Sequence, residues 1–189
     1  DLVCATRGPG LIGALLVGFS AAKAMAWALG KPFIGVNHVL AHIYANFLGD
    51  NPPVPPLLCL VVSGGHTDLF YLGEEEKFLH LGGTRDDAAG ECLDKAARLL
   101  GLGYPGGPAV EEAARRGQPR FHLPRPIIEG RLEFSFSGLK TALANLIRRL
   151  AAEKKEVPVP DLAASLQQAV VEGLVAKLQA AAELYRPRA

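Results

Sequence analysis

LLCLVVSGGHTDLFYLG, residues 57–73, is the segment from which the fold class of this chain follows most directly. Two runs rich in Leu, Val, Phe and Tyr flank a Gly-Gly pair, a pattern typical of two strands joined by a tight turn. We therefore predict a β-hairpin and a sheet that is at least partly antiparallel. The segment KFLHLGG at 77–83 is expected to add a third strand.

Upstream of the hairpin, strand-like and helix-like segments alternate. LVCAT at 2–6 and KPFIGVN at 31–37 read as buried strands, and helices are expected at 11–30 and 38–48. This alternation indicates a parallel sheet. The 11–30 segment is mostly apolar and about as long as a membrane span. Lys23 in its middle and its small residues favour a buried helix of an α/β fold over a span.

The stretch NPPVPP at 51–56 is too rich in proline for regular structure and is predicted to be a linker. It separates a first domain at 1–50 from a second at 57–189. Further helices are expected at 86–102, from 109, at 134–155 with a Ser cap, and at about 161–185. The chain begins on a strand and stops after a helix that should lead into another strand. A sheet with such open edges suggests a piece of a longer protein.

The bulk composition excludes several classes of protein. A net charge of +1 over 189 residues argues against wholesale coating of nucleic acid, so any basic surface must be local. The scattered cysteines Cys4, Cys59 and Cys92 form no disulfide framework, which favours a reducing cytoplasm. The first residues lack the basic region of a signal peptide.

The stretch GVNHVLAH at 35–42 places two histidines on one face of the predicted helix. Side chains at i and i+4 lie about one turn apart, so His38 and His42 could share a metal ion. From spacing alone, a solvent-facing or capping pair is an equal alternative. The zincin motif H-E-x-x-H supplies a Glu as general base. No Glu lies between these histidines, which counts against metalloprotease chemistry.

Other polar residues could contact a nucleotide. Ser63, Gly64 and Gly65 form a turn whose backbone N–H groups could cradle phosphate, although any hairpin favours Gly-Gly. Asp94 either reaches ribose hydroxyls or forms a plain i,i+4 pair with Arg98. The segment GYPGGP at 103–108 either lets a ligand approach the backbone closely or is an ordinary loop.

A basic segment lies at 115–131, RRGQPRFHLPRPIIEGR. Its arginines are interleaved with Phe121 and His122. A solvated loop is one interpretation. The other is a patch that contacts phosphates, where Arg side chains position the nucleic acid without reading its base sequence.

Several segments, in this order, resemble the threonylcarbamoyl transferase family called TsaD, formerly Gcp or O-sialoglycoprotein endopeptidase. They are TRGPGLIGALLVG, GKPFIGVNHVLAHIYANF, VVSGGHTDL, DDAAGECLDKAARLLGLGYPGGPAVEEAA and FSFSGLKTAL. The resemblance implies an α/β, actin-like (ASKHA, ribonuclease H-like) two-lobed fold that is incomplete in this chain. Residues 1–50 would end the first lobe, and residues 57–189 would begin the second, with a helical insertion.

The resemblance also implies a reaction. A threonylcarbamoyl group would pass from threonylcarbamoyl-AMP to the adenosine beside the anticodon of tRNAs that read codons starting with A. The implied partners are tRNA, a paralogous actin-like subunit (TsaB-like) and a small ATPase (TsaE-like), with no membrane. The implied cofactor is one divalent metal, iron or zinc, since two imidazoles suit either.

Site residues carry over by position, although no catalytic residue is identified. His38 and His42 match the family's metal histidines. The residues that match substrate contacts are Val61, Val62, Ser63, Gly64, Gly65, Asp94, Gly107 and Glu111. From the basic segment we expect tRNA to contact Arg115, Arg116 and Arg120.

The chain departs from the family pattern at both ends. It lacks the first strand motif GIETSCD, a later Asn that contacts the nucleotide and a late Asp that completes the metal site. The piece on its own is therefore expected to be inactive. Rival readings are an actin-like small-molecule kinase, which does not need the histidine pair, and a non-catalytic paralogue, which lacks it.

Overall fold

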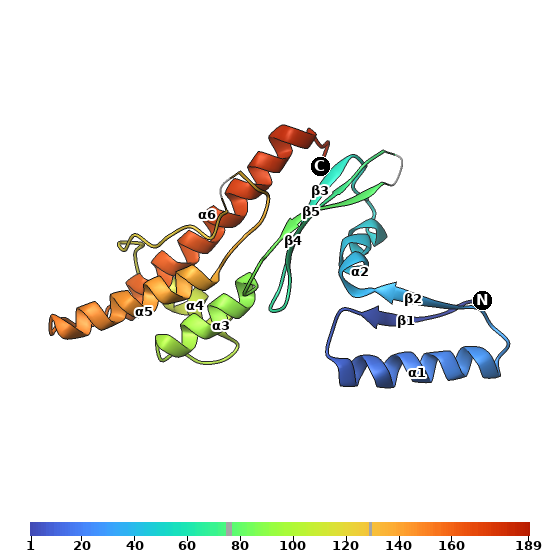
Figure 1. The fold of residues 1–189 in the computed structure, drawn as a ribbon, viewed down its shortest axis with the longest axis horizontal. Coiled ribbons are helices and arrows are strands. Elements are labelled where there is room, and N and C mark those ends of the chain that lie inside the picture. The colour runs from blue at the N-terminus through green and yellow to red at the C-terminus, as the bar shows by residue number, and fades with distance from the viewer. Residues whose placement is uncertain (75–76, 129) are drawn as a thin grey trace. The chain divides into compact units, whose positions relative to one another are not determined.

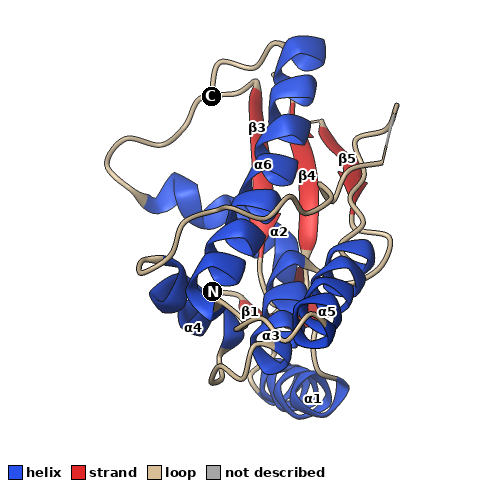
Figure 2. Cartoon of the chain, turned by 90° about the vertical axis from the view of Figure 1, so that its left-hand side faces the viewer, coloured by secondary structure: helices blue, strands red, loops and turns tan. Residues whose placement is uncertain are grey.

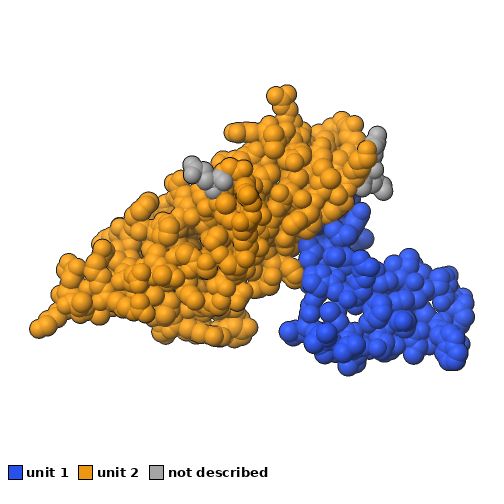
Figure 3. Space-filling model, viewed as in Figure 1, with its two compact units in different colours: residues 1–53 blue, residues 54–189 orange. Residues whose placement is uncertain are grey.

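The computed structural model describes residues 1–74, 77–128 and 130–189. Two compact units make up the chain, unit 1 at Asp1–Pro53 and unit 2 at Val54–Ala189, coloured separately in Figure 3. The division falls within the proline-rich stretch at 51–56. The assignment of the two parts to actin-like lobes stays a prediction.

Unit 1 is a small parallel α/β layer (Figure 1). Its elements are β1 (Val3–Gly8), α1 (Ile12–Ala28), β2 (Phe33–Asn37), α2 (His38–Tyr44) and the 3-10 helix η1 (Ala45–Leu48). Strands β1 and β2 pair in parallel, which confirms the arrangement that the alternating pattern predicts. The helix expected at 38–48 is thus about two α-helical turns followed by a tighter 3-10 turn.

The prediction that α1 is a buried helix is wrong for this unit. Only Ala26 on α1 is buried, whereas Ile12, Val17 and Trp27 are 78%, 74% and 88% exposed. The helix packs on the sheet at Phe19, whose ring lies 5.0 Å from that of Phe33. A sheet of two strands is too narrow to cover an apolar helix on more than one side. Among the described residues, no helix has the length and apolarity to cross a membrane.

Unit 2 opens with the sheet that the hairpin motif predicts. It comprises β3 (Leu57–Val62), β4 (Thr67–Leu72) and β5 (Phe78–Gly83), in the order β3-β4-β5 with both pairs antiparallel. The hairpin and the third strand are therefore confirmed. The turn spans 63–66, and the apolar side chains of β4 are buried.

Four helices follow the sheet: α3 (Ala89–Leu99), α4 (Gly106–Ala114), α5 (Ser137–Ala152) and α6 (Val159–Tyr185). All four were predicted, but α4 begins three residues earlier than expected and takes in Gly106, Gly107 and Pro108. Proline is tolerated in a first helical turn because the N–H it lacks has no partner there. The last helix contacts β3, beside which it runs in Figure 2.

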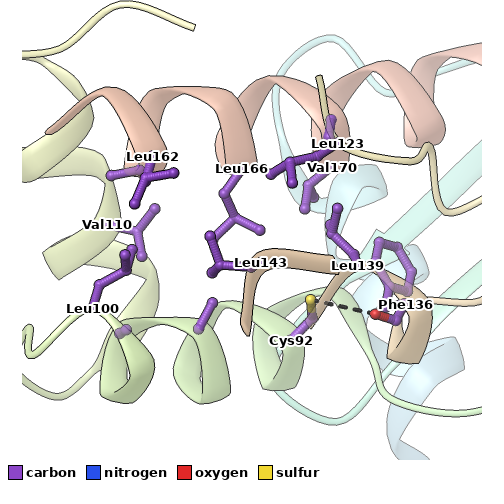
Figure 4. Packing of buried hydrophobic residues seen from close by; sticks show 14 of the residues in the cluster. Cys92, Leu100, Val110, Leu123, Phe136, Leu139, Leu143, Leu162, Leu166 and Val170 are labelled. Atoms are coloured by element: carbon purple, nitrogen blue, oxygen red, sulfur yellow. Dashed lines mark hydrogen bonds between the residues drawn. The ribbon is translucent and has the colours of Figure 1, made fainter. Parts of the chain in front are cut away.

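The core of unit 2 lies where α3, α4, α5 and α6 meet (Figure 4). Cys92, Leu143 and Leu166 are fully buried there, with Val110 and Phe136 beside them. The Cys92 thiol points at the backbone carbonyl of Phe136, with sulfur and oxygen 3.7 Å apart. Burial, together with nearby carboxylates, raises the pKa of Cys92 to about 12. This cysteine is therefore a packing residue and an unreactive one.

We expect Leu166→Ala to lower the free energy of unfolding by about 2 to 5 kcal/mol, because it leaves a cavity in this core. Urea unfolding of the full chain measures the loss. Leu184→Ala, on the same helix but 69% exposed, is the matched control and should change stability little. Equal losses for the two variants would contradict this packing.

Candidate functional site

The two histidines lie together on α2 in unit 1. The Asn37 side chain accepts hydrogen bonds from the N–H groups of Val39 (2.9 Å) and Leu40 (3.1 Å), and so fixes where the helix starts. Val39 and Ile43 are buried, which turns the neighbouring face with His38 and His42 outward. The two Nε2 atoms converge to 3.2 Å.

This separation suits two ligands of one metal ion. Tetrahedral zinc with ligand nitrogens at about 2.0–2.1 Å sets them roughly 3.3 Å apart. A hydrogen bond from one ring to the other gives the same distance, so the polar-pair alternative has the same geometry. Within the described ranges, no cluster of three or more His, Cys, Asp or Glu could hold a metal. The pair has the spacing of two metal ligands, and the described residues do not supply a third.

In unit 2, the hairpin turn rests on the start of α3. The Ser63 hydroxyl accepts hydrogen bonds from the N–H groups of Gly65 (3.3 Å) and His66 (3.0 Å). The Ser63 carbonyl accepts from the N–H of Gly90 at 3.1 Å. A Cβ on Gly90 would lie 2.8 Å from Gly64 Cα, so only glycine allows this approach. The outer faces of Gly64 and Gly65 are open, since nothing lies within 4 Å of a Cβ there.

From this turn, a line of site residues runs along α3 to α4. Asp94 lies one turn after Gly90, on the same helix face. Its Oδ1 accepts the backbone N–H of Gly106 at 2.7 Å, at the first residue of α4. Gly107 and Glu111 follow, one turn apart on α4. The structure thus joins the predicted nucleotide contacts of unit 2 into one strip.

The structure speaks against the ion-pair interpretation of Asp94, while its contact with a ribose stays a prediction. The ion pairs found between described residues do not include one between Asp94 and Arg98. Asp94 instead holds the first N–H of α4, where no side chain of α4 itself provides a cap. A carboxylate at a helix N-terminus is also favoured by the helix dipole.

The predicted tRNA-binding arginines have different surroundings. Arg115 pairs with Glu111 at 2.8 Å and with Glu112 at 3.5 Å. Arg120 lies 3.6 Å from Asp161. Arg116 is exposed and takes part in none of the ion pairs found among described residues. Its positive charge is therefore the least compensated of the three.

Sequence reasoning missed Asp86, which joins two distant segments. Its carboxylate accepts the hydroxyls of Ser135 (2.6 Å) and Ser137 (2.8 Å), and the N–H groups of Phe136 (2.7 Å) and Ser137 (3.2 Å). The expected Ser cap of α5 is therefore wrong. Asp86 caps this helix, and the Ser135 and Ser137 hydroxyls donate to the Asp86 carboxylate. About fifty residues separate the partners, so no local spacing signals the contact.

These bonds set the protonation of Asp86. Partial burial raises its pKa, but the hydrogen bonds from Ser135, Ser137 and the Phe136 backbone outweigh that effect and leave the pKa below its usual value. A carboxylate whose pKa is lowered by folding stabilises the folded state above its unfolded pKa of about 3.9. That stabilisation is lost as the pH falls through the folded pKa.

We expect Asp86→Asn to lower the free energy of unfolding by about 1 to 2 kcal/mol at pH 7, through loss of charge-assisted hydrogen bonds. The difference from wild type should shrink as the pH falls from about 4 through the lowered folded pKa of Asp86, because protonation there removes the charge. Urea unfolding at several pH values tests this. Glu156→Gln, an exposed carboxylate of the same unit, is the control. A difference that stays constant with pH would argue against this role of the Asp86 carboxylate.

Comparison with known proteins places the chain. Residues 1–189 match the family described as TsaD: tRNA N6-adenosine threonylcarbamoyltransferase. A curated relative of that name from Symbiobacterium thermophilum is 56% identical over 184 residues, covering 97% of this chain and 54% of the relative. One from Dictyoglomus turgidum is 52% identical over 175 residues, covering 93% and 52%. One from Geobacillus thermodenitrificans is 52% identical over 189 residues, covering 100% and 55%.

The chain spans about half the length of the curated relatives it matches. The open sheet and the exposed α1 of unit 1 accord with a partial α/β domain. The family match confirms the predicted actin-like ASKHA fold class. By the identity of its relatives and a match that runs along its whole length, this chain belongs to the TsaD family.

Proposed function

We propose that the protein to which these residues belong is a tRNA-modifying acyltransferase. It transfers the threonylcarbamoyl group of threonylcarbamoyl-AMP to the adenosine beside the anticodon in tRNAs that read codons starting with A. The observation that carries the proposal is the family match over residues 1–189, in relatives named for this transfer. The presence of both His38 and His42 supports it, because a kinase does not need this pair and a non-catalytic paralogue lacks it.

Metal binding would fall to unit 1 and adenylate binding to unit 2. In unit 1, His38 and His42 would hold one divalent metal, iron or zinc, with ligands supplied by the rest of the protein. Bound there, such a metal would supply Lewis acidity toward a carbonyl oxygen. In unit 2, the turn after Val61 and Val62 would approach the adenylate phosphate through the open faces of Gly64 and Gly65.

The strip on α3 and α4 would bind the sugar and base of the adenylate. Asp94 uses one carboxylate oxygen for the Gly106 N–H, which leaves the other to accept from a ribose hydroxyl. Gly107 has no side chain to hinder the ligand, and Glu111 lies one turn further along. Glu111 would have to share its carboxylate between the substrate and Arg115.

The partners we propose are tRNA, a TsaB-like paralogous subunit and a small TsaE-like ATPase, all in the cytoplasm. The three cysteines are free thiols, as a reducing compartment favours. Contact with tRNA would involve Arg115, Arg116 and Arg120. Arg116 is available as it stands, whereas Arg115 and Arg120 would exchange a carboxylate partner for phosphate.

We expect His38→Ala and His42→Ala in the full-length protein each to remove bound metal and to abolish threonylcarbamoyl transfer, while the thermal midpoint changes little. Elemental analysis and an assay on unmodified tRNA provide the two readouts. His80→Gln, an exposed histidine of unit 2, is the control and should keep its metal. Undiminished metal in both alanine variants would refute the ligand assignment.

Replacing Arg115, Arg116 and Arg120 together with Ala should weaken tRNA binding and flatten its dependence on salt. Each lost phosphate contact lowers the salt slope by about 0.7 to 0.9, because fewer counterions are released. An equal charge change at Arg148, Arg149 and Lys154 on or after α5 is the control. If the affinity of the triple variant follows the wild-type salt curve, the basic segment does not bind tRNA.

A further inference from the structure

A cavity of about 280 Å³ lies in unit 2 between the basic segment and α6. Its lining includes Arg120, Phe121, His122 and Arg125 from the segment, and Gln168 and Glu172 from α6. It is separate from the strip on α3 and α4, none of whose residues line it. No role proposed above makes use of Phe121, His122, Gln168 or Glu172.

The wall of this cavity is held in place by the fold. The hydroxyl of Ser165, a buried residue of α6, accepts the backbone N–H of Phe121 at 3.1 Å. The Asp161 carboxylate accepts the N–H of Gln118 at 2.8 Å. At Gly117 the backbones approach so closely that a Cβ would lie 2.2 Å from Pro160, which only glycine avoids. The segment is therefore fastened to α6 before any ligand arrives, which reduces the entropy cost of binding.

The chemistry of the lining selects the class of ligand. Glu172 accepts hydrogen bonds from Gln168 (2.7 Å) and Arg125 (2.9 Å), so donors and acceptors stand side by side. One carboxylate stands here beside two guanidinium groups, so the lining suits a ligand that carries both donors and acceptors better than a purely apolar one. The aromatic residue Phe121 also lines the cavity, while the rest of its half-buried side chain packs against the core.

Aromatic rings, guanidinium planes and mixed donors and acceptors are what proteins use to bind unstacked RNA bases. The cavity is slightly smaller than the roughly 300 Å³ at which sites for drug-sized ligands begin, a size that suits a single base. A second hollow shares Pro119 and Gln168 with it and is lined by Arg115 and by Glu111, the last residue of the strip. A nucleotide next to the inserted base would therefore find one of the basic segment's arginines.

We propose that this cavity binds one unpaired nucleobase of the RNA substrate, with Phe121 as stacking surface and Gln168 and Glu172 as hydrogen-bonding groups. The proposal rests on the proposed function, which makes tRNA the substrate. It adds a base pocket outside the adenylate strip, so that the protein holds its substrate at a point other than the reacting adenosine.

The test is tRNA binding by the full-length protein and its Gln168→Leu variant, measured by fluorescence anisotropy over a range of salt concentrations. Leucine keeps the size and helix preference of Gln168 but cannot hydrogen-bond a base. We expect affinity to fall about tenfold, as for the loss of one base contact, with the salt slope unchanged because no phosphate contact is removed. Phe121→Leu, which removes the stacking ring, should give a similar loss provided that its thermal midpoint shows it to be folded.

The matched control is Gln179→Leu, the same change at an exposed position of α6 outside the cavity. It should bind tRNA as wild type does. In the transfer assay, the weaker binding of Gln168→Leu should appear as a raised KM for tRNA. Unchanged tRNA affinity of Gln168→Leu would overturn the base pocket, including the case in which the variant loses only binding to a protein partner. A lower salt slope of tRNA binding in this variant would also overturn it. Failure of the proposed function is seen separately, because wild type would then leave tRNA unmodified.

Discussion

The close approach of α3 to its neighbours sets the geometry of unit 2. At its start, Gly90 lies against the hairpin turn, and a Cβ there would come within 2.7 Å of the Ser63 carbonyl. One turn later, a Cβ on Gly106 of α4 would lie 2.4 Å from Asp94 Cα. Because both contacts are backbone to backbone, no side-chain rearrangement could relieve the clash that a larger residue would make at either glycine. The strip from turn to α4 therefore has little freedom to deform.

The backbone N–H groups at the N-terminus of α3 find their hydrogen-bond acceptors in β4 and in the hairpin turn. The buried hydroxyl of Thr67 accepts the N–H of Ala89 at 2.9 Å, while the Ser63 carbonyl accepts that of Gly90. Asp86, just before this helix, caps α5 in turn. Orphan N–H groups at both helix starts are thus satisfied by residues from other elements. The apolar core beneath then fixes which helix faces meet.

Charge in the basic segment is more balanced than its composition suggests. Most of its arginines have a carboxylate partner from another turn or helix, such as Glu172 for Arg125 and Asp161 for Arg120. Exposed pairs of this kind add little stability. The pairs of Arg120 and Arg125 do hold these two guanidinium groups against α6, where both side chains line the same hollow. Arg116 differs from these arginines because it takes part in none of the ion pairs found among the described residues.

Local patterns in the sequence determined the hairpin, the parallel pair of strands, the helices and the spacing of His38 and His42. These features depend on periodicity and on neighbours within one turn, which a sequence displays directly. Only the tertiary structure decided that Asp94 holds Gly106, that Asp86 caps α5 and that α1 is largely exposed. Such contacts join residues distant in the chain or depend on how much of a helix its neighbours cover. Periodicity carries no record of either, because both are settled by packing in three dimensions.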